Sequence, residues 1–109
     1  MIKKYNKLVR DRIPEIIQAA GKTAGYEILS DEAFLQKLEE KLEEEVAEFR
    51  AEKDLEELAD LLEVIYAIAR ARNCSPEELE SIRREKEKAR GGFRQKILLI
   101  EVGDEQGSP

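Results

Sequence analysis

Residues 34–72 read FLQKLEEKLEEEVAEFRAEKDLEELADLLEVIYAIARAR, and this stretch decides the fold of the chain. Its apolar residues recur every three or four positions, which is the spacing of one face of an α-helix. A polar break at residues 51–54 divides the stretch into two helices. Because the connection is so short, the two helices are expected to pack as antiparallel neighbours. The sequence therefore predicts an all-α fold, an antiparallel helical bundle built on this hairpin.

Each of the two helices carries an acidic pair with a spacing of three residues. The pairs are Glu45 with Glu48 and Glu57 with Asp60. Side chains three apart on a helix lie on the same face. At about 100° per residue, Glu45 and Glu57 project inside the apolar arcs of their helices. Glu48 and Asp60 fall at the edges of those arcs, so the hairpin is predicted to gather all four carboxylates.

Four carboxylates on apolar faces need protons, partners or a metal ion. Two of them about 5 Å apart repel by roughly 3 kcal/mol at an effective dielectric constant near 20. Oxygen ligands without histidine or cysteine suit Mg²⁺, and also Mn²⁺. The sequence therefore indicates a magnesium site whose ligands are Glu45, Glu48, Glu57 and Asp60.

Three other interpretations of these acidic residues stay open. Glu57 stands three residues after Asp54 and can close a capping box at a helix start. Glu45 can extend to solvent or pair with a lysine. In a chain with 40% charged residues, some acidic pairs also arise by chance.

The composition bounds the class of protein. With 109 residues the chain is expected to form one domain, residues 1–102, followed by a disordered tail at residues 103–109. The net charge of −6 argues against a protein that coats nucleic acid polymers. A single cysteine excludes an intramolecular disulfide. No signal peptide and no membrane-spanning run is apparent, so a cytoplasmic protein without a membrane partner is expected.

Helix-capping residues and helix breakers predict the bounds of the remaining elements. Pro14 opens a short helix that ends near Ala20, with Gly21 after it. Ser30 or Asp31 caps the first long helix. Residues 75–78, SPEE, begin a further helix that ends before Gly91. Two segments, residues 22–29 and 93–102, are expected to be extended or short strands, with a pairing between them as one option.

Basic residues gather near the start of the chain and on the last helix. Five of them precede the acidic middle: Lys3, Lys4, Lys7, Arg10 and Arg12. Most are expected to be solvated, but Lys7 and Arg10 share a face if that stretch turns. The basic face of the last helix is expected to form surface ion pairs.

Three motifs together resemble a known family. EEVAE at residues 44–48, followed by ELAD at residues 57–60, is similar to the EExxE…ExxD signature of the all-α NTP pyrophosphohydrolases, the MazG-like and phosphoribosyl-ATP pyrophosphohydrolase-like proteins. The opening YNKLVRDRIPEII and the late KARGGF resemble a small subfamily of that group. The resemblance covers residues 5–102. Only eight residues separate Glu48 from Glu57, which is short for the signature.

The resemblance implies an activity and a set of roles. Mg²⁺ bound by Glu45, Glu48, Glu57 and Asp60 would hold a nucleoside triphosphate, which water would split into the monophosphate and pyrophosphate. Glu45 or Glu48 would take the proton of the water. The residues expected to bind the phosphates of the nucleotide substrate are Lys7, Arg10, Lys86 and Arg90. Members of the family are homodimers or larger homo-oligomers, so dimerisation is expected to complete the bundle. A non-catalytic helical interaction dimer and a nucleotide sensor without turnover are the alternatives.

Overall fold

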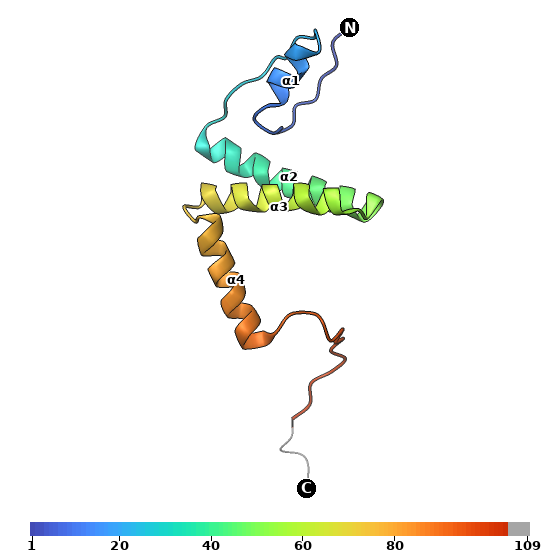
Figure 1. The fold of residues 1–109 in the computed structure, drawn as a ribbon, viewed down its shortest axis with the longest axis vertical. Helices are drawn as coiled ribbons and strands as arrows, with labels where there is room; N and C mark the ends of the chain where they lie inside the picture. The colour runs from blue at the N-terminus through green and yellow to red at the C-terminus, as the bar shows by residue number, and fades with distance from the viewer. Residues whose placement is uncertain (105–109) are drawn as a thin grey trace.

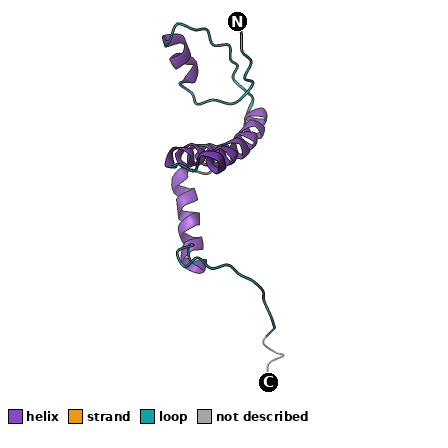
Figure 2. Ribbon diagram, turned by 90° about the vertical axis from the view of Figure 1, so that its right-hand side faces the viewer, coloured by secondary structure: helices purple, strands orange, loops and turns teal. Residues whose placement is uncertain are grey.

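The regular secondary structure is entirely helical within residues 1–104, the part of the chain that this computed structural model describes. Four α-helices follow one another in that range: α1 (Ile13–Ala19), α2 (Asp31–Glu52), α3 (Leu55–Ala71) and α4 (Pro76–Arg90). No strand occurs among these residues (Figure 2). The predicted all-α class is therefore confirmed.

A sharp reversal between α2 and α3 builds the hairpin. Lys53 adopts a left-handed backbone (φ 57°), and its N–H donates to the Phe49 carbonyl at 2.7 Å. Asp54 then caps α3, because its side chain accepts a hydrogen bond from the Glu57 N–H at 3.1 Å. With only two residues between them, the helices run side by side in opposite directions (Figure 1). The predicted antiparallel pair is confirmed.

The other helix ends follow their local sequence. Ser30 caps α2, with its hydroxyl accepting from the Ala33 N–H at 3.2 Å. Ser75 forms a full capping box with Glu78 at the start of α4, which begins at Pro76. Gly91 ends α4 in a backbone with φ +82°, which glycine adopts without steric cost. These boundaries match the predicted ones within about a residue, the usual uncertainty of a helix end.

For residues 22–29 and 93–102 the sequence left two alternatives, extended segments or short strands, and the strand alternative was wrong. Both segments lack regular structure, and they lie on opposite sides of the hairpin, so they do not pair (Figure 1). Apolar residues in the second segment do not pack either, since Phe93 and Ile97 are 97% and 78% exposed. The physical reason is that a helical hairpin offers no sheet edge with which these segments could pair. The disordered tail was predicted at residues 103–109, and residues 105–109 lie outside the part of the chain that the structure describes.

The buried core of the chain is small. Only Leu38, Val64 and Ala69 are buried apolar residues within the described range. The radius of gyration is 20.2 Å, whereas a compact domain of this length has one of about 13 Å. No Cα of α1 lies within 8 Å of a Cα of another helix, and α4 contacts only α3 before it projects away (Figure 1). One chain therefore forms an open arrangement around a central hairpin.

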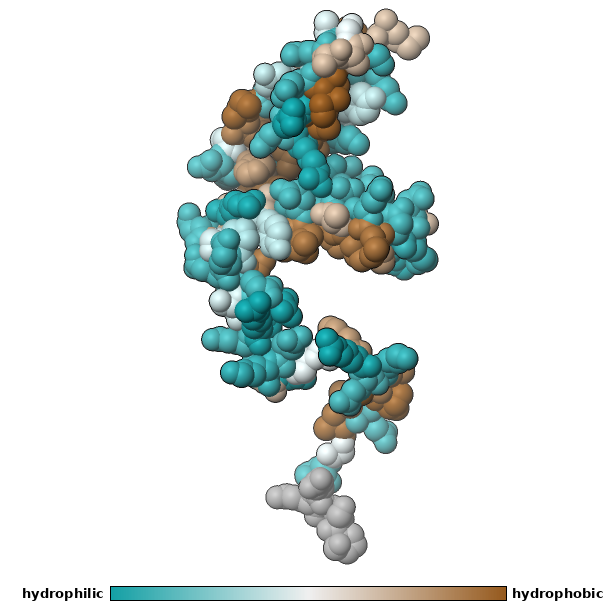
Figure 3. All heavy atoms as spheres, in the orientation of Figure 1, coloured by the Kyte–Doolittle hydropathy of each residue, from teal (hydrophilic) through white to brown (hydrophobic). Residues whose placement is uncertain are grey.

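An apolar stripe remains exposed along the hairpin. Leu55, Leu58 and Leu62 are spaced to share one face of α3, and they are 79%, 41% and 45% exposed. Figure 3 shows this apolar surface along the lower edge of the hairpin, away from the N-terminal segment. Within residues 1–104, none of the helices combines the length and the apolar character needed to cross a membrane.

The cap of α4 leads to a test of local stability. Replacing Ser75 with alanine removes the hydroxyl that accepts from the Glu78 N–H at 3.1 Å. We expect a loss of about 1 kcal/mol in the free energy of unfolding, measured by urea denaturation. Ser81→Ala, at an exposed position inside α4, is the matched control and should be neutral or slightly stabilising. Equal stability of the two variants would contradict the role of the cap.

Candidate metal site

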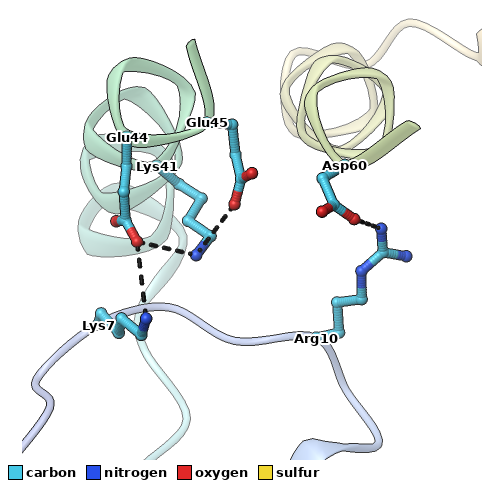
Figure 4. A network of polar contacts seen from close by, with 6 residues as sticks. All are labelled: Lys7, Arg10, Lys41, Glu44, Glu45 and Asp60. Carbon is cyan, nitrogen blue, oxygen red and sulfur yellow. Dashed lines mark hydrogen bonds and ion pairs between the residues drawn. The ribbon is translucent and has the colours of Figure 1, made fainter. Parts of the chain in front are cut away.

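Three carboxylates meet on the hairpin. Glu45 comes from α2, and Glu57 and Asp60 come from consecutive turns of α3. Each offers one oxygen, and these oxygens all lie within 4.8 Å of one another. They converge because Glu45 lies on the side of α2 that faces α3, and because Glu57 and Asp60 are three residues apart. In Figure 4, Glu45 and Asp60 both point toward the side that the N-terminal segment crosses.

Two members of this acidic cluster have a buried oxygen without a partner. Glu45 is 6% exposed, and its Oε2 accepts no hydrogen bond. Oε2 of the half-buried Glu57 is likewise buried and unpaired. An unpaired buried carboxylate oxygen is costly, because water no longer solvates it. A hard divalent cation such as Mg²⁺ or Mn²⁺ accepts ligands of this type, so the residues present fit such an ion.

The fourth predicted ligand, Glu48, lies beside the cluster rather than within it. Glu48 is exposed, and it does not belong to the group of three converging carboxylates. Its charge nevertheless acts on Glu57. The structure thus brings together three of the four predicted ligands and leaves Glu48 at the margin, where it faces solvent.

The pKa of Glu57 is raised above its ordinary value. Burial is the largest cause, followed by the negative charges of Glu48, Asp54 and Asp60. A raised pKa in the folded chain means that ionising Glu57 destabilises the fold. The contribution of the neutral carboxyl is fully present below the unfolded pKa of 4.5 and is lost as pH rises through the folded pKa.

The competing interpretations of Glu57 and Glu45 can now be compared with the geometry. Asp54 does cap α3, but the side chain of Glu57 does not complete a capping box, and one of its oxygens stays unpaired. Glu45 does pair with a lysine, since Lys41 Nζ lies 3.3 Å from its Oε1. That ion pair leaves Oε2 without a donor. Neither interpretation accounts for both orphaned oxygens.

The N-terminal segment crosses the open side of this cluster and brings two cations to it. Arg10 Nη2 donates to Asp60 Oδ1 at 2.8 Å, and Lys7 Nζ lies 3.8 Å from Glu44 Oε1. Figure 4 shows the segment passing beneath both helices, with Lys7 opposite α2 and Arg10 opposite α3. We call residues 6–10 the cationic strap. Lys7 and Arg10 were expected to share a face if this stretch turned or formed a helix. Residues 7–10 form no helix, and both side chains reach the hairpin from an irregular segment.

Lys41 is a site residue that the sequence analysis missed. Its side chain is only 18% exposed, and its Nζ lies 3.3 Å from both Glu44 Oε1 and Glu45 Oε1. Burial alone would lower the pKa of Lys41, but the hydrogen bonds and charges of Glu44 and Glu45 outweigh it and raise that pKa. Lys41 therefore stays protonated beside the cluster. Its spacing of four residues from Glu45 was the available signal.

The remaining predicted phosphate ligands, Lys86 and Arg90, lie on another part of the chain. They lie in the second half of α4. This helix follows the C-terminal end of α3, whereas Glu57 lies near the N-terminal end of α3. Glu57 is fourteen residues before that end, which corresponds to about 21 Å along the helix axis. Since α4 then projects away from the hairpin (Figure 1), a single chain does not bring these two residues to the cluster.

Comparisons with known proteins identify no family. No family model matches the chain, and no solved structure matches it. A curated protein of Mycolicibacterium smegmatis (strain ATCC 700084 / mc(2)155), described as uncharacterized, is 56% identical over 45 residues. Those residues make up 41% of this chain and 46% of that protein, so the similarity spans less than half of the relative's own length. The family resemblance and the activity that it implies therefore stay predictions.

The environment of Glu57 generates a test that needs no substrate. In metal-free protein, Glu57→Gln removes the carboxylate whose ionisation is unfavourable in the fold. We expect the variant to melt at a higher temperature than the wild type near pH 7. The gain should shrink as pH falls through the raised pKa of the folded carboxyl, and it should vanish below the unfolded value of 4.5.

The same melting curves provide the control and the metal response. Glu43→Gln, on an exposed position of α2, should give no such pH-dependent gain. Added Mn²⁺ should stabilise the wild type more than Glu57→Gln, because a ligand that binds only the folded state raises its stability. A wild type that melts at the same temperature with and without Mn²⁺ would contradict the metal site.

Proposed function

We propose that this protein is a Mg²⁺-dependent nucleotide pyrophosphohydrolase, with Mn²⁺ as a possible substitute ion. Its substrate would be a nucleoside triphosphate, a deoxynucleoside triphosphate or a related nucleotide such as phosphoribosyl-ATP, and its products the monophosphate and pyrophosphate. The observation that carries the proposal is the pair of buried, unpaired oxygens of Glu45 and Glu57 in one carboxylate cluster. The motif resemblance to the MazG-like proteins points to the same activity.

The opposite charges at the site suit this reaction. A divalent ion held by Glu45, Glu57 and Asp60 would polarise the phosphates and lower the pKa of water. Arg10 and Lys7 lie on the adjoining strap, where they can offset charge on the phosphates. An acidic cluster alone would repel a nucleotide, and a basic patch alone would not hold the ion. Together, the acidic cluster can hold the metal ion and the basic strap can hold the phosphates of a metal–nucleotide complex.

The bond changes can be assigned to residues of this chain. The oxygen of a water molecule attacks the α-phosphorus, and the bond from that phosphorus to the oxygen bridging to the β-phosphorus breaks. The bonding electron pair leaves with pyrophosphate. The water's proton passes to a carboxylate, for which Glu48 is the better placed of the two predicted bases. Glu48 is exposed beside the cluster, whereas Glu45 is buried and already paired with Lys41.

We further propose that a second copy of the chain covers the apolar stripe of the hairpin. Leu55, Leu58 and Leu62 leave a continuous apolar face exposed, and the chain is far less compact than a domain of its length. A self-complementary face of this kind is typical of two-fold dimers. A homodimer would also allow Lys86 and Arg90 of one copy to reach the acidic cluster of the other. The proposal places the enzyme in the cytoplasm, with neither a membrane nor a nucleic acid polymer as partner.

The exposed apolar face also suits a helical module that binds other proteins without catalysis, and a nucleotide sensor would keep the site without turnover. The response to ligands separates the three. Mg²⁺ and a nucleotide added together should raise the melting temperature of an enzyme or a sensor, but not of a simple interaction module. Pyrophosphate release then distinguishes the enzyme from the sensor.

The enzymatic proposal is tested by measuring pyrophosphate release from nucleoside triphosphates, deoxynucleoside triphosphates and phosphoribosyl-ATP, with Mg²⁺ or with EDTA. We expect Mg²⁺-dependent release from at least one of them. Glu48→Gln should lower the turnover about a hundredfold or more, the typical contribution of a general base, with an unchanged helical circular dichroism spectrum. Glu43→Gln should retain activity. Folded protein that turns over no substrate of the panel would refute the proposal, and a fully active Glu48→Gln would refute the role of Glu48.

The dimer proposal has its own measurement. Light scattering after size-exclusion chromatography should give twice the mass of the 12.5 kDa chain for the wild type. Leu62→Glu places a charge in the centre of the apolar stripe and should shift the protein toward the monomer. Ile2→Glu changes an exposed apolar residue outside the stripe and should remain dimeric. A monomeric wild type at all accessible concentrations would overturn the proposal.

A further inference from the structure

A cavity of about 140 Å³ lies between the cationic strap and α2. The strap contributes one wall and the middle of α2 the other, and the lining residues are Asn6, Lys7, Leu8, Lys37, Glu40, Lys41 and Glu44. Three lysines face two glutamates, so the lining is net positive in a chain whose net charge is −6. The cavity is large enough for several water molecules or a small anionic group.

Lys41 joins this cavity to the acidic cluster. Its ammonium group lies 3.3 Å from Glu45 Oε1 in the cluster and 3.3 Å from Glu44 Oε1 in the cavity wall. Figure 4 shows Lys41 between these two carboxylates, with Lys7 reaching Glu44 from the strap below. The cation-binding carboxylates and the lysine-lined cavity are therefore neighbours on the same side of the hairpin.

Two of the three lysines of the cavity, Lys7 and Lys37, are held by ion pairs that an anion can displace. Lys7 and Glu44 are 3.8 Å apart, and Lys37 and Glu40 are 3.5 Å apart. All four side chains are between 34% and 57% exposed. Ion pairs this open to solvent contribute at most about 1 kcal/mol. A phosphate group carries more charge and more acceptor oxygens than one carboxylate, so it competes well for the same ammonium groups.

We propose that this cavity is the subsite for the end of a phosphate chain, bound by Lys37 and Lys41 together with Lys7. The ligand class is a group of linked phosphates, because such a ligand offers oxygens to a divalent ion at the carboxylates and further charge to the neighbouring lysines. The inference rests on the proposed function, which it deepens: the terminal phosphates, and so the pyrophosphate product, occupy the lysine cavity.

The subsite predicts a preference for longer phosphate chains. A triphosphate reaches from the carboxylates into the cavity, whereas a single phosphate can occupy only one of the two places. Loss of one charged hydrogen-bond donor from the cavity should weaken the binding of a linked phosphate about tenfold or more. The effect on a ligand with a single phosphate should be much smaller.

The test uses inorganic tripolyphosphate with Mg²⁺ as the probe, with affinity measured by isothermal titration calorimetry on the full chain. Lys37→Met should lower the affinity about tenfold, since Lys37 binds no member of the acidic cluster and its loss leaves that cluster intact. Lys41→Met should lower it at least as much. Lys22→Met, an exposed lysine outside the cavity, is the matched control and should bind like the wild type. Circular dichroism verifies that each variant is folded.

Each outcome of the titrations decides between alternatives. Wild-type affinity in folded Lys37→Met overturns the subsite. Equal affinity of the wild type for monophosphate and for tripolyphosphate also overturns it, because a site for one phosphate would then suffice. If tripolyphosphate binding depends on Lys37 but no nucleotide is hydrolysed, the subsite stands and the proposed hydrolase falls. If nucleotides are hydrolysed and Lys37→Met changes neither tripolyphosphate binding nor the KM for a triphosphate, only the subsite falls.

Discussion

The candidate site depends on one contact, in which the buried carboxylate of Glu45 on α2 meets Glu57 and Asp60 on α3. Glu45 lies in the small core of the hairpin, where a leucine or valine would ordinarily pack, and only one of its oxygens has a partner. Glu57 adds a second orphaned oxygen across the helix interface. Burying charge in this way opposes folding, and the raised pKa of Glu57 records the same cost. A cation bound among these oxygens would relieve it.

The cationic strap places positive charge beside the acidic cluster. Arg10 and Lys7 reach it from a segment far away in sequence, while Lys41 reaches it from within α2. Because the carboxylates and the ammonium groups lie side by side, the same small region can hold a positive ion and a negative chain. This separation of charge supports a nucleotide phosphate as ligand more strongly than either half does alone. The lining of the lysine cavity is net positive although the whole chain has a net charge of −6.

The open arrangement of the chain is consistent with the proposed binding of a second copy. A hairpin with so few buried residues and an exposed apolar stripe has much surface left to bury. At about 100° per residue, Glu57 and Asp60 project away from the face of α3 that carries Leu55, Leu58 and Leu62. A partner on the apolar face would therefore leave the site accessible. α4 and the apolar residues 93–102 extend away from the hairpin, and Phe93 and Ile97 remain exposed in the single chain.

The sequence by itself determined the helices, their ends and the placement of the acidic residues on the hairpin. Periodicity and caps act over three or four residues, and the folded chain keeps them, as at Ser75, Gly91 and the two-residue turn before α3. Only the tertiary structure decided that Arg10 contacts Asp60, that Lys41 shares two glutamates, and that residues 93–102 form no strand. Arg10 and Asp60 are 50 residues apart, and no local rule links them. Their contact depends on how the strap crosses two packed helices, which is a property of the whole fold.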